Sequence, residues 1–429
     1  MAKKILALLL ACVMVLAVVG CGKSDDNNGD STNTAASTGN VTGTSNSGDK
    51  VTVPADFKVG FIYIGDENEG YTLAHYNGAK EMMQTLGVPE SQCIFKWGIP
   101  DDGSYDAAVD LAEAGCNIIF ANSFGHEDGV LQAAKEYPDI EFCHATGYKA
   151  ANSGLKNMHN AFTAVYESRY IAGVLAGCKL NEMIEAGTIT ADEAKVGYVG
   201  AFSFAEVKSG FTSFYLGMKS VCPTVKMEVK YTGSWGNQAL EKETAEALIS
   251  QGCVLVSQHA DTTGAAVACE AQKVYNVGYN VSMIDAAPNY AITSASINWG
   301  PYVTYAVECA LKGEEFPSDW CKGFSDGAVR ITEVNKKAFA SEESYNNAMA
   351  KATEAEDAIK AGTLHVFDTK NWTVDGKTIT STKDIEGYNG LEYIKTEGDV
   401  SYFQESTLAS APSFAFIIDG ITELNQNFG

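Results

Sequence analysis

Short segments that mix aromatic and polar side chains recur along this chain, and each lies close behind an apolar run. Aromatic faces stack on flat rings, and a few convergent polar groups suffice to orient a small ligand. The pattern therefore predicts a cleft that binds a small ligand. The candidate ligand-binding residues are Asp66, Tyr71, His75, Ser123, Phe124, Trp235, His259, Asp261, Asn280 and Trp299.

The apolar runs themselves have the length and composition of buried β-strands. Examples are residues 59–64, 117–121 and 254–256, and amphipathic stretches such as 73–86 and 238–250 lie between runs of this kind. Strands that alternate with helices at this spacing form right-handed βαβ units and a parallel sheet. Because ligands bind beyond the carboxyl ends of parallel strands, we expect the candidate residues to meet in one cleft.

The alternation starts again after a long helix predicted for residues 167–184, so the chain contains two similar α/β halves. Beyond about residue 366 the alternation fades, and the last segment is turn-rich and polar before a final apolar run. The predicted organisation is lobe 1 over 57–162 and 291–322, lobe 2 over 163–290 and 323–368, and a C-terminal extension over 369–429 that packs on lobe 2.

The N-terminal residues have the features of an export signal. Lys3 and Lys4 precede a fifteen-residue apolar run, which is the length of a signal-peptide core and short for a membrane span. The run ends in Val18-Val19-Gly20-Cys21, which resembles a lipidation motif, so residues 1–20 are a predicted signal peptide. Residues 21–56 contain the lipidated Cys21 and a predicted flexible tether of Ser, Thr, Asn and Gly.

Charge and motif content exclude several classes of function. The formal net charge of −24 repels nucleic acid and anionic lipid, so neither is an expected partner, and the lipid anchor is the only expected membrane contact. The chain has no dinucleotide or phosphate-binding glycine loop, no G-x-S-x-G turn and no H-E-x-x-H pair. We therefore expect a binding protein rather than an enzyme, with no cofactor.

The cysteines give no sign of a metal site. Eleven are present, but none forms a C-x-x-C pair, so we expect no zinc or iron–sulfur centre. Nine remain without Cys12 and Cys21, an odd number, so at least one thiol is unpaired. Cys143 and Cys253 fall in predicted strands, where a buried apolar role is expected.

Several of these segments together resemble the basic membrane protein family of substrate-binding lipoproteins. The matching pieces occur in the family's order between Lys58 and about Thr363, roughly 70% of the chain. They include Val59-Gly60-Phe61-Ile62-Tyr63, Phe142-Cys143-His144-Ala145-Thr146-Gly147-Tyr148, Glu167-Ser168-Arg169-Tyr170-Ile171-Ala172-Gly173, Ser257-Gln258-His259-Ala260-Asp261 and Asn298-Trp299-Gly300-Pro301-Tyr302.

The resemblance implies a type I periplasmic-binding-protein fold, with two Rossmann-like lobes joined by three hinge segments around an enclosed ligand. It also implies a monomeric, lipid-anchored protein outside the cytoplasm that delivers a purine nucleobase or nucleoside to an ABC permease. By the same resemblance, Tyr71 and Trp235 clamp the base. The family's G-x-D segment is Gly278-Tyr279-Asn280 here, and its late lysine is replaced near Asn298, which puts ribose recognition in doubt.

Three alternatives remain open at this point. A signalling lipoprotein would sense the same ligand without transport. A binding protein for a sugar or another small polar ligand is also possible, because sugars stack on Trp and Tyr. Sugar sites usually add several Asp, Asn and Arg side chains, however, and Arg169 and Arg330 are the only arginines in the chain. An enzyme without a known motif would be separated from these by a turnover assay.

Cys21→Ala is predicted to release the protein from the membrane fraction, because the thiol that receives the lipid is lost. Fractionation of cells followed by immunoblotting measures this directly, with Cys12→Ala as the matched control that should stay membrane-bound. A Cys21→Ala protein that remains in the membrane fraction would show that the assignment of this motif is wrong.

Overall fold

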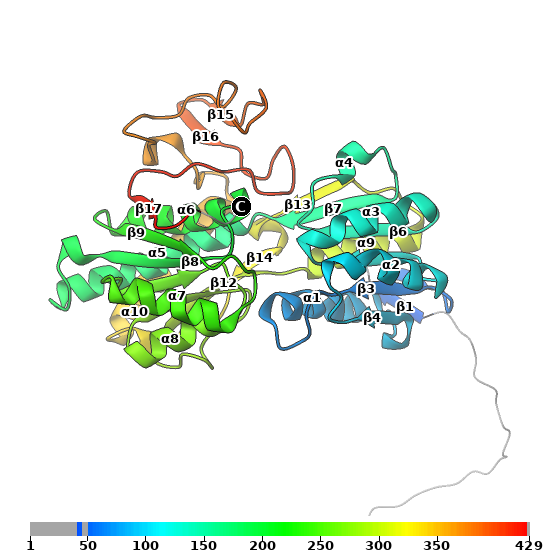
Figure 1. Cartoon of the computed structure of the whole chain (residues 1–429), viewed down its shortest axis with the longest axis horizontal. Helices are drawn as coiled ribbons and strands as arrows, with labels where there is room; N and C mark the ends of the chain where they lie inside the picture. The colour runs from blue at the N-terminus through cyan, green and yellow to red at the C-terminus, as the bar shows by residue number, and fades with distance from the viewer. Residues whose placement is uncertain (1–40, 45–49, 427–429) are drawn as a thin grey trace, which may run out of the picture. The chain divides into compact units, whose positions relative to one another are not determined.

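Two α/β lobes and a C-terminal extension make up the part of the chain that the computed structural model describes, residues 41–44 and 50–426 (Figure 1). Each lobe is built on a sheet of mainly parallel strands with helices packed on it. The predicted α/β fold with two parallel-sheet lobes is therefore confirmed. The predicted signal peptide and Cys21 lie outside the described residues.

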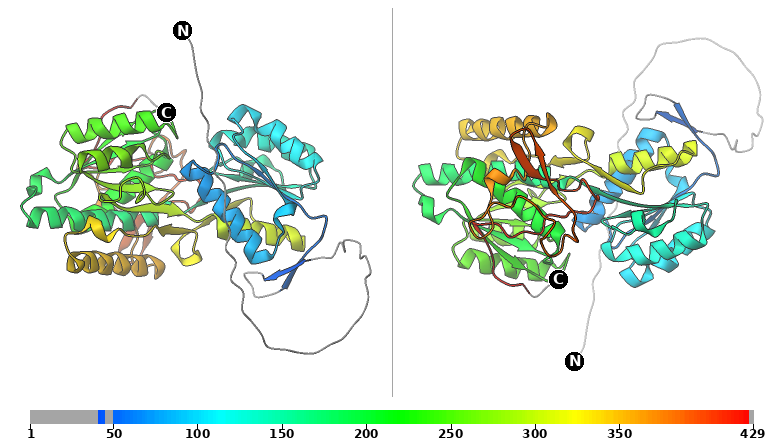
Figure 2. Two further views of the ribbon diagram at one scale, coloured as in Figure 1. Left: turned by 90° about the horizontal axis from the view of Figure 1, so that it is seen from below. Right: turned by 90° about the horizontal axis from the view of Figure 1, so that it is seen from above.

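Lobe 1 has six parallel strands in the order β13-β7-β6-β5-β3-β4. Neighbouring residues of one strand face different hydrophobic clusters, as Ile118 and Ile119 do, so the sheet is buried on both faces. Helices α1 and α9 pack side by side on one of these faces (Figure 2). The elements of lobe 1 are β3 (Val59–Ile62), α1 (Gly70–Leu86), β4 (Cys93–Lys96), α2 (Ser104–Glu113), β5 (Ile118–Ala121), α3 (Glu127–Glu136), β6 (Glu141–Ala145), α4 (Ala150–Ser153), β7 (Met158–Thr163), α9 (Gly300–Lys312) and β13 (Asp319–Lys322).

Lobe 2 has seven strands in the order β14-β12-β11-β10-β8-β9-β17, and only β14 runs antiparallel to its neighbour. Its helices α5 and α6 pack closely against each other. The elements of lobe 2 are α5 (Val165–Glu185), β8 (Lys195–Gly200), α6 (Ala205–Val221), β9 (Lys226–Tyr231), α7 (Gln238–Ser250), β10 (Leu255–Gln258), α8 (Gly264–Gln272), β11 (Tyr275–Tyr279), β12 (Ala291–Ile297), β14 (Val329–Ile331) and α10 (Glu342–Lys360).

The chain passes between the lobes three times, between β7 and α5, between β12 and α9, and between β13 and β14. The boundary predicted at residue 291 is wrong, because β12 belongs to lobe 2 rather than to lobe 1. All seven residues of β12 are buried, and the strand pairs with β11 on one side and β14 on the other. The crossing therefore follows β12, next to Asn298.

The folded part begins earlier than the tether predicted over residues 21–56 allows. Strands β1 (Val41–Thr44) and β2 (Lys50–Val53) form an antiparallel pair. Val51 and Val53 are buried and join the hydrophobic core of lobe 1, close to Phe57. Three apolar side chains within seven residues are enough to hold this segment on the lobe, and the prediction underestimated them.

The C-terminal extension packs on lobe 2 and completes its sheet (Figure 1). It contains the antiparallel pair β15 (Ile394–Glu397) and β16 (Val400–Phe403), and β17 (Ile421–Glu423), which pairs in parallel with β9. Buried aromatic side chains join it to lobe 2, including Trp372 and Phe414. The backbone N–H of Ser410 also donates to Asp319 Oδ2 of lobe 1 at 2.5 Å.

The nine cysteines from Cys93 to Cys321 are all described, and none of these nine forms a disulfide. Cys143 and Cys253 are buried, as expected for side chains that fill apolar space. Burial raises the pKa of the Cys253 thiol to about 12, which keeps this thiol protonated and unreactive at neutral pH.

Gly217→Ala is predicted to destabilise lobe 2 by about 2 kcal/mol, because a Cβ atom at this position would overlap the Tyr170 carbonyl oxygen of α5. Urea unfolding at constant pH measures the change. Gly103→Ala is the control, since its Cβ would meet Pro100 atoms at 3.4 Å, an ordinary contact. Equal stability of both variants would show that α5 and α6 tolerate a wider separation.

Candidate functional site

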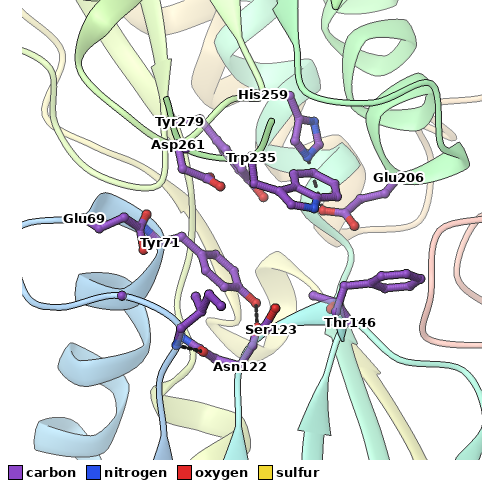
Figure 3. A pocket seen from close by; sticks show the side chains of 14 residues that line it. Glu69, Tyr71, Asn122, Ser123, Thr146, Glu206, Trp235, His259, Asp261 and Tyr279 are labelled. Atoms are coloured by element: carbon purple, nitrogen blue, oxygen red, sulfur yellow. Dashed lines mark hydrogen bonds and ion pairs between the residues drawn. The ribbon is translucent and has the colours of Figure 1, made fainter. Parts of the chain in front are cut away.

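A cavity of about 310 Å³ lies between the two lobes, at the carboxyl ends of their strands (Figure 3). Lobe 1 contributes side chains from the loops after β3, β5 and β6. Lobe 2 contributes side chains that follow β8, β9 and β10, and the last residue of β11. The lining residues are Ile64, Gly65, Glu69, Tyr71, Asn122, Ser123, Phe124 and Thr146 of lobe 1, and Glu206, Trp235, Gly236, His259, Asp261 and Tyr279 of lobe 2.

Tyr71 is fixed at both ends in the wall that lobe 1 provides. Its backbone N–H donates to the Glu69 carboxylate at 2.6 Å, which caps the first turn of α1. Its hydroxyl donates to the Asn122 carbonyl oxygen at 2.5 Å, and the Asn122 side chain in turn accepts from the backbone N–H of Ile64 at 2.9 Å. The ring is therefore held in one orientation, with its hydroxyl already satisfied by the protein.

Trp235 occupies the facing wall in lobe 2, in the loop after β9. Its ring is half-buried and contacts Phe202 edge-on, with 5.2 Å between the ring centroids. Its carbonyl oxygen accepts from the backbone N–H of Asp261 at 2.8 Å, which ties the loop after β9 to the loop after β10. The two walls thus present aromatic side chains from opposite lobes to one cavity (Figure 3).

Asp261 places a carboxyl group in the cavity that favours the protonated form. Burial raises the pKa of Asp261 well above its usual value, and the charges of Glu69, Glu241 and Glu206 raise it further. One of its oxygens, Oδ1, accepts from Asn280 Nδ2 at 2.7 Å. A protonated carboxyl group offers both a hydrogen-bond donor and an acceptor, so it can pair with a ligand edge that carries both.

His259 and Glu206 form the second polar pair of this wall, with His259 Nε2 3.3 Å from Glu206 Oε1. Burial, together with the positive charge of Arg169, lowers the pKa of His259 well below its usual value, so the imidazole is neutral. Burial raises the pKa of Glu206 to about 7, although Arg169 acts in the opposite direction. The pair therefore changes protonation state close to neutral pH.

Arg169 lies beneath this wall and is fully buried. Its Nη1 donates to the carbonyl oxygen of Gln258 at 2.6 Å, and its guanidinium carbon lies 3.8 Å from the centroid of the Tyr279 ring. Its Nε and Nη2 have no hydrogen-bond partner among the described residues. The guanidinium group thus supports two strand ends that line the cavity.

Six of the ten residues predicted from the sequence line this cavity, and their part in binding stays a prediction. They are Tyr71, Ser123, Phe124, Trp235, His259 and Asp261.

The other four lie outside the cavity lining. Asn280 is buried behind Asp261. His75 and Trp299 stack on each other in the core of lobe 1, with 4.1 Å between ring centroids, because Trp299 follows the crossing from β12 and packs against α1. Asp66 is exposed, and its carboxylate accepts from the backbone N–H of Asn68 in its own loop.

The sequence interpretation missed five polar or aromatic side chains of the lining, namely Glu69, Asn122, Thr146, Glu206 and Tyr279. Glu69, Asn122 and Tyr279 lie beside predicted residues at the same strand ends, so those segments were the available signal. Thr146 follows β6, where no site residue was predicted. Glu206 was harder to find, because it lies in the first turn of α6. An acidic residue there is common, since it interacts favourably with the helix N-terminus.

Two parallel-sheet lobes that enclose a cavity between their strand ends define the class of solute-binding proteins. The family model described as ABC transporter substrate-binding protein, PnrA-like, matches residues 58–361, so the chain belongs to this family. This confirms the family predicted from the sequence. A protein of this family has a small-molecule ligand and an ABC permease as its partners, and it works outside the cytoplasm.

Two relatives and one solved structure illustrate the similarity. The chain is 32% identical over 312 residues to a purine-binding protein of Brucella abortus, covering 72% of this chain and 83% of the relative. It is 26% identical to a protein of Haloferax volcanii whose name gives glucose as the ligand, covering 64% of this chain and 66% of the relative. A solute-binding protein of Aeropyrum pernix has the same fold, with a TM-score of 0.60 and 16% identity, over 72% of this chain and 93% of that one.

No helix within residues 41–44 and 50–426 is long and apolar enough to cross a membrane.

Glu206→Gln is predicted to change how stability depends on pH. The folded protein holds the Glu206 proton up to about pH 7, whereas the unfolded chain releases it near pH 4.5, so this group lowers the free energy of unfolding as pH rises between these values. The variant should therefore be more stable than wild type at pH 8, by on the order of 1–3 kcal/mol, and equal to it below about pH 4.5.

Urea unfolding at pH 4.5 and pH 8 makes this comparison, with Glu67→Gln on the exposed loop of lobe 1 as the control. If Glu206→Gln and wild type differ by the same amount at both pH values, Glu206 does not titrate in this range.

Proposed function

We propose that this protein captures a purine nucleobase or nucleoside between Tyr71 and Trp235 and delivers it to an ABC importer. The observation that carries the proposal is the pair of aromatic side chains held on opposite walls of one cavity. Every purine has two flat faces, and stacking on an aromatic ring contributes roughly 1–3 kcal/mol per base. The similarity to the purine-binding protein of Brucella abortus supports the same ligand class.

The polar groups of the cavity suit the edge of a purine. Purine edges carry N–H donors beside ring-nitrogen acceptors, and Asp261, Glu206 and His259 supply matching groups from lobe 2. None of the lining residues is Lys or Arg, so a phosphate group would meet carboxyl groups and no cation. The ligand in our proposal is therefore an unphosphorylated purine.

The remaining predicted residues take supporting roles in this proposal. Ser123 and Phe124 meet the ligand from lobe 1, and Asn280 orients Asp261 through its hydrogen bond. His75 and Trp299 hold α1, and with it Tyr71, in position from the core of lobe 1. Asp66 belongs to the loop that leads into α1 and has no contact with the cavity in our assignment.

The finer features of the proposal come from the sequence. We infer that Cys21 carries the lipid anchor, that the protein acts as a monomer, and that it binds its ligand without chemical change. The acidic composition favours a partner other than nucleic acid.

A sugar is the second candidate ligand, because a relative from Haloferax volcanii has glucose in its name and because sugars also stack on Trp and Tyr. The cavity lining has the carboxyl groups that sugar sites use but no arginine. A planar heterocycle accounts better for two aromatic rings on facing walls.

Trp235→Ala is predicted to weaken purine binding at least tenfold, because one face of the ligand loses its stacking partner. Isothermal titration calorimetry with adenine, guanine, hypoxanthine, adenosine, guanosine and glucose, on wild type and variant, measures the loss and identifies the ligand.

The matched control is Tyr290→Ala, which removes a half-buried ring of lobe 2 that contacts the Tyr275 ring at a tilt and is absent from the cavity lining. Failure of the wild-type protein to bind any purine would refute the ligand. Unchanged purine affinity in Trp235→Ala would refute the stacking arrangement alone.

A further inference from the structure

A chain of aromatic rings runs from the binding cavity to the protein surface. Trp235 contacts Phe202, and Phe202 stacks on Phe204 with 5.3 Å between ring centroids. Phe204 lies 6.0 Å from Phe124, and Phe124 stacks on Tyr148 at 6.3 Å. The first three rings belong to lobe 2 and the last two to lobe 1, so the contact between Phe204 and Phe124 crosses the cleft.

The two rings that meet across the cleft are large, apolar and partly open to solvent. Phe124 is 41% exposed and Phe204 is 36% exposed even while they touch. Separation of the lobes would expose both rings further, with the corresponding loss of apolar burial. The contact therefore stabilises the arrangement with the lobes together and contributes nothing when they are apart.

The residues next to each ring make hydrogen bonds within their own lobe. Phe124 follows Ser123, whose hydroxyl donates to Asp101 Oδ1 at 2.7 Å and whose carbonyl oxygen lies 2.7 Å from His144 Nε2. Phe204 is the residue before α6, and its carbonyl oxygen accepts from the backbone N–H of Val207 at 3.1 Å. The backbone next to each ring is therefore held by hydrogen bonds within its own lobe.

We propose that Phe124 and Phe204 form an aromatic gate that holds the lobes closed and retains the ligand. The proposal rests on the function proposed above. Phe202 packs between Phe204 and Trp235. The ring of the gate in lobe 2 and the ring that stacks on the ligand therefore belong to one aromatic cluster. Ligand enters while the lobes are apart, and the gate slows its departure once they close.

The rates of binding and release provide the test. Phe124→Ala and Phe204→Ala should each accelerate ligand dissociation roughly threefold to tenfold, the range expected for loss of one aromatic pair. Association should change little, because the open form has no such contact. The double variant should release ligand about as fast as either single variant, since both substitutions remove the same interaction.

Tyr148→Ala is the matched control. It removes a ring that is 55% exposed and stacks on Phe124, but within lobe 1. Stopped-flow tryptophan fluorescence on the full chain, with the six compounds used for calorimetry, gives both rate constants. The acceleration in Phe204→Ala should be the same for each compound that binds, because Phe204 is absent from the cavity lining, whereas Phe124 also lines the cavity.

The outcomes separate this proposal from the function on which it rests. Dissociation rates that are unchanged in both Phe variants, or that rise equally in Tyr148→Ala, would overturn the gate while the ligand assignment stands. If the wild-type protein binds glucose but no purine, the assignment of a purine ligand is refuted. The gate is then tested by the dissociation rate of glucose in the same variants. Binding of none of the compounds would overturn both.

Discussion

The binding wall of lobe 2 depends on one buried cation. Arg169 is fully enclosed, and a guanidinium group does not lose its proton in a protein, so the surrounding structure must accommodate the charge. It does so with the carbonyl oxygen of Gln258, at the end of β10, and the face of Tyr279, at the end of β11. One side chain from α5 thereby fixes the end of β10, from which His259 and Asp261 follow, and the end of β11, where Tyr279 lines the cavity.

The same charge acts beside burial on the protonation of the wall. It lowers the pKa of His259 and opposes the rise that burial causes in the pKa of Glu206. Lobe 1 is organised differently, because Tyr71 is held there by neutral hydrogen bonds and by the Glu69 cap. The wall from lobe 2 is therefore organised around a buried charge, and the wall from lobe 1 is organised by hydrogen bonds.

Much of this arrangement could be predicted from the sequence, because alternating strands and helices determine which loops share a sheet edge. That rule brought Tyr71, Trp235 and Asp261 to one cavity from distant parts of the chain. It could not show that Tyr279, the last residue of β11, lines the cavity, whereas the next residue, Asn280, is buried behind Asp261. The direction of one side chain at a strand end is decided by packing rather than by periodicity.

The crossing between lobes was misplaced for a similar reason. The run 291–297 reads equally well as the last strand of lobe 2 or the first returning strand of lobe 1, and only its pairing with β11 decides. With the crossing one strand later, Trp299 lies in the core of lobe 1 instead of at a strand end that faces the cavity. A single error in sheet pairing thus displaced a predicted binding residue.

Two acidic side chains from opposite lobes approach each other in this cavity. After burial, the largest cause of the raised pKa of Asp261 is the charge of Glu69, which belongs to the opposite lobe. Burial also raises the pKa of Glu69, although its hydrogen bonds to Tyr71 and Thr72 act in the opposite direction. The protonated form of Asp261 is therefore favoured by the same arrangement that brings Phe124 and Phe204 together across the cleft.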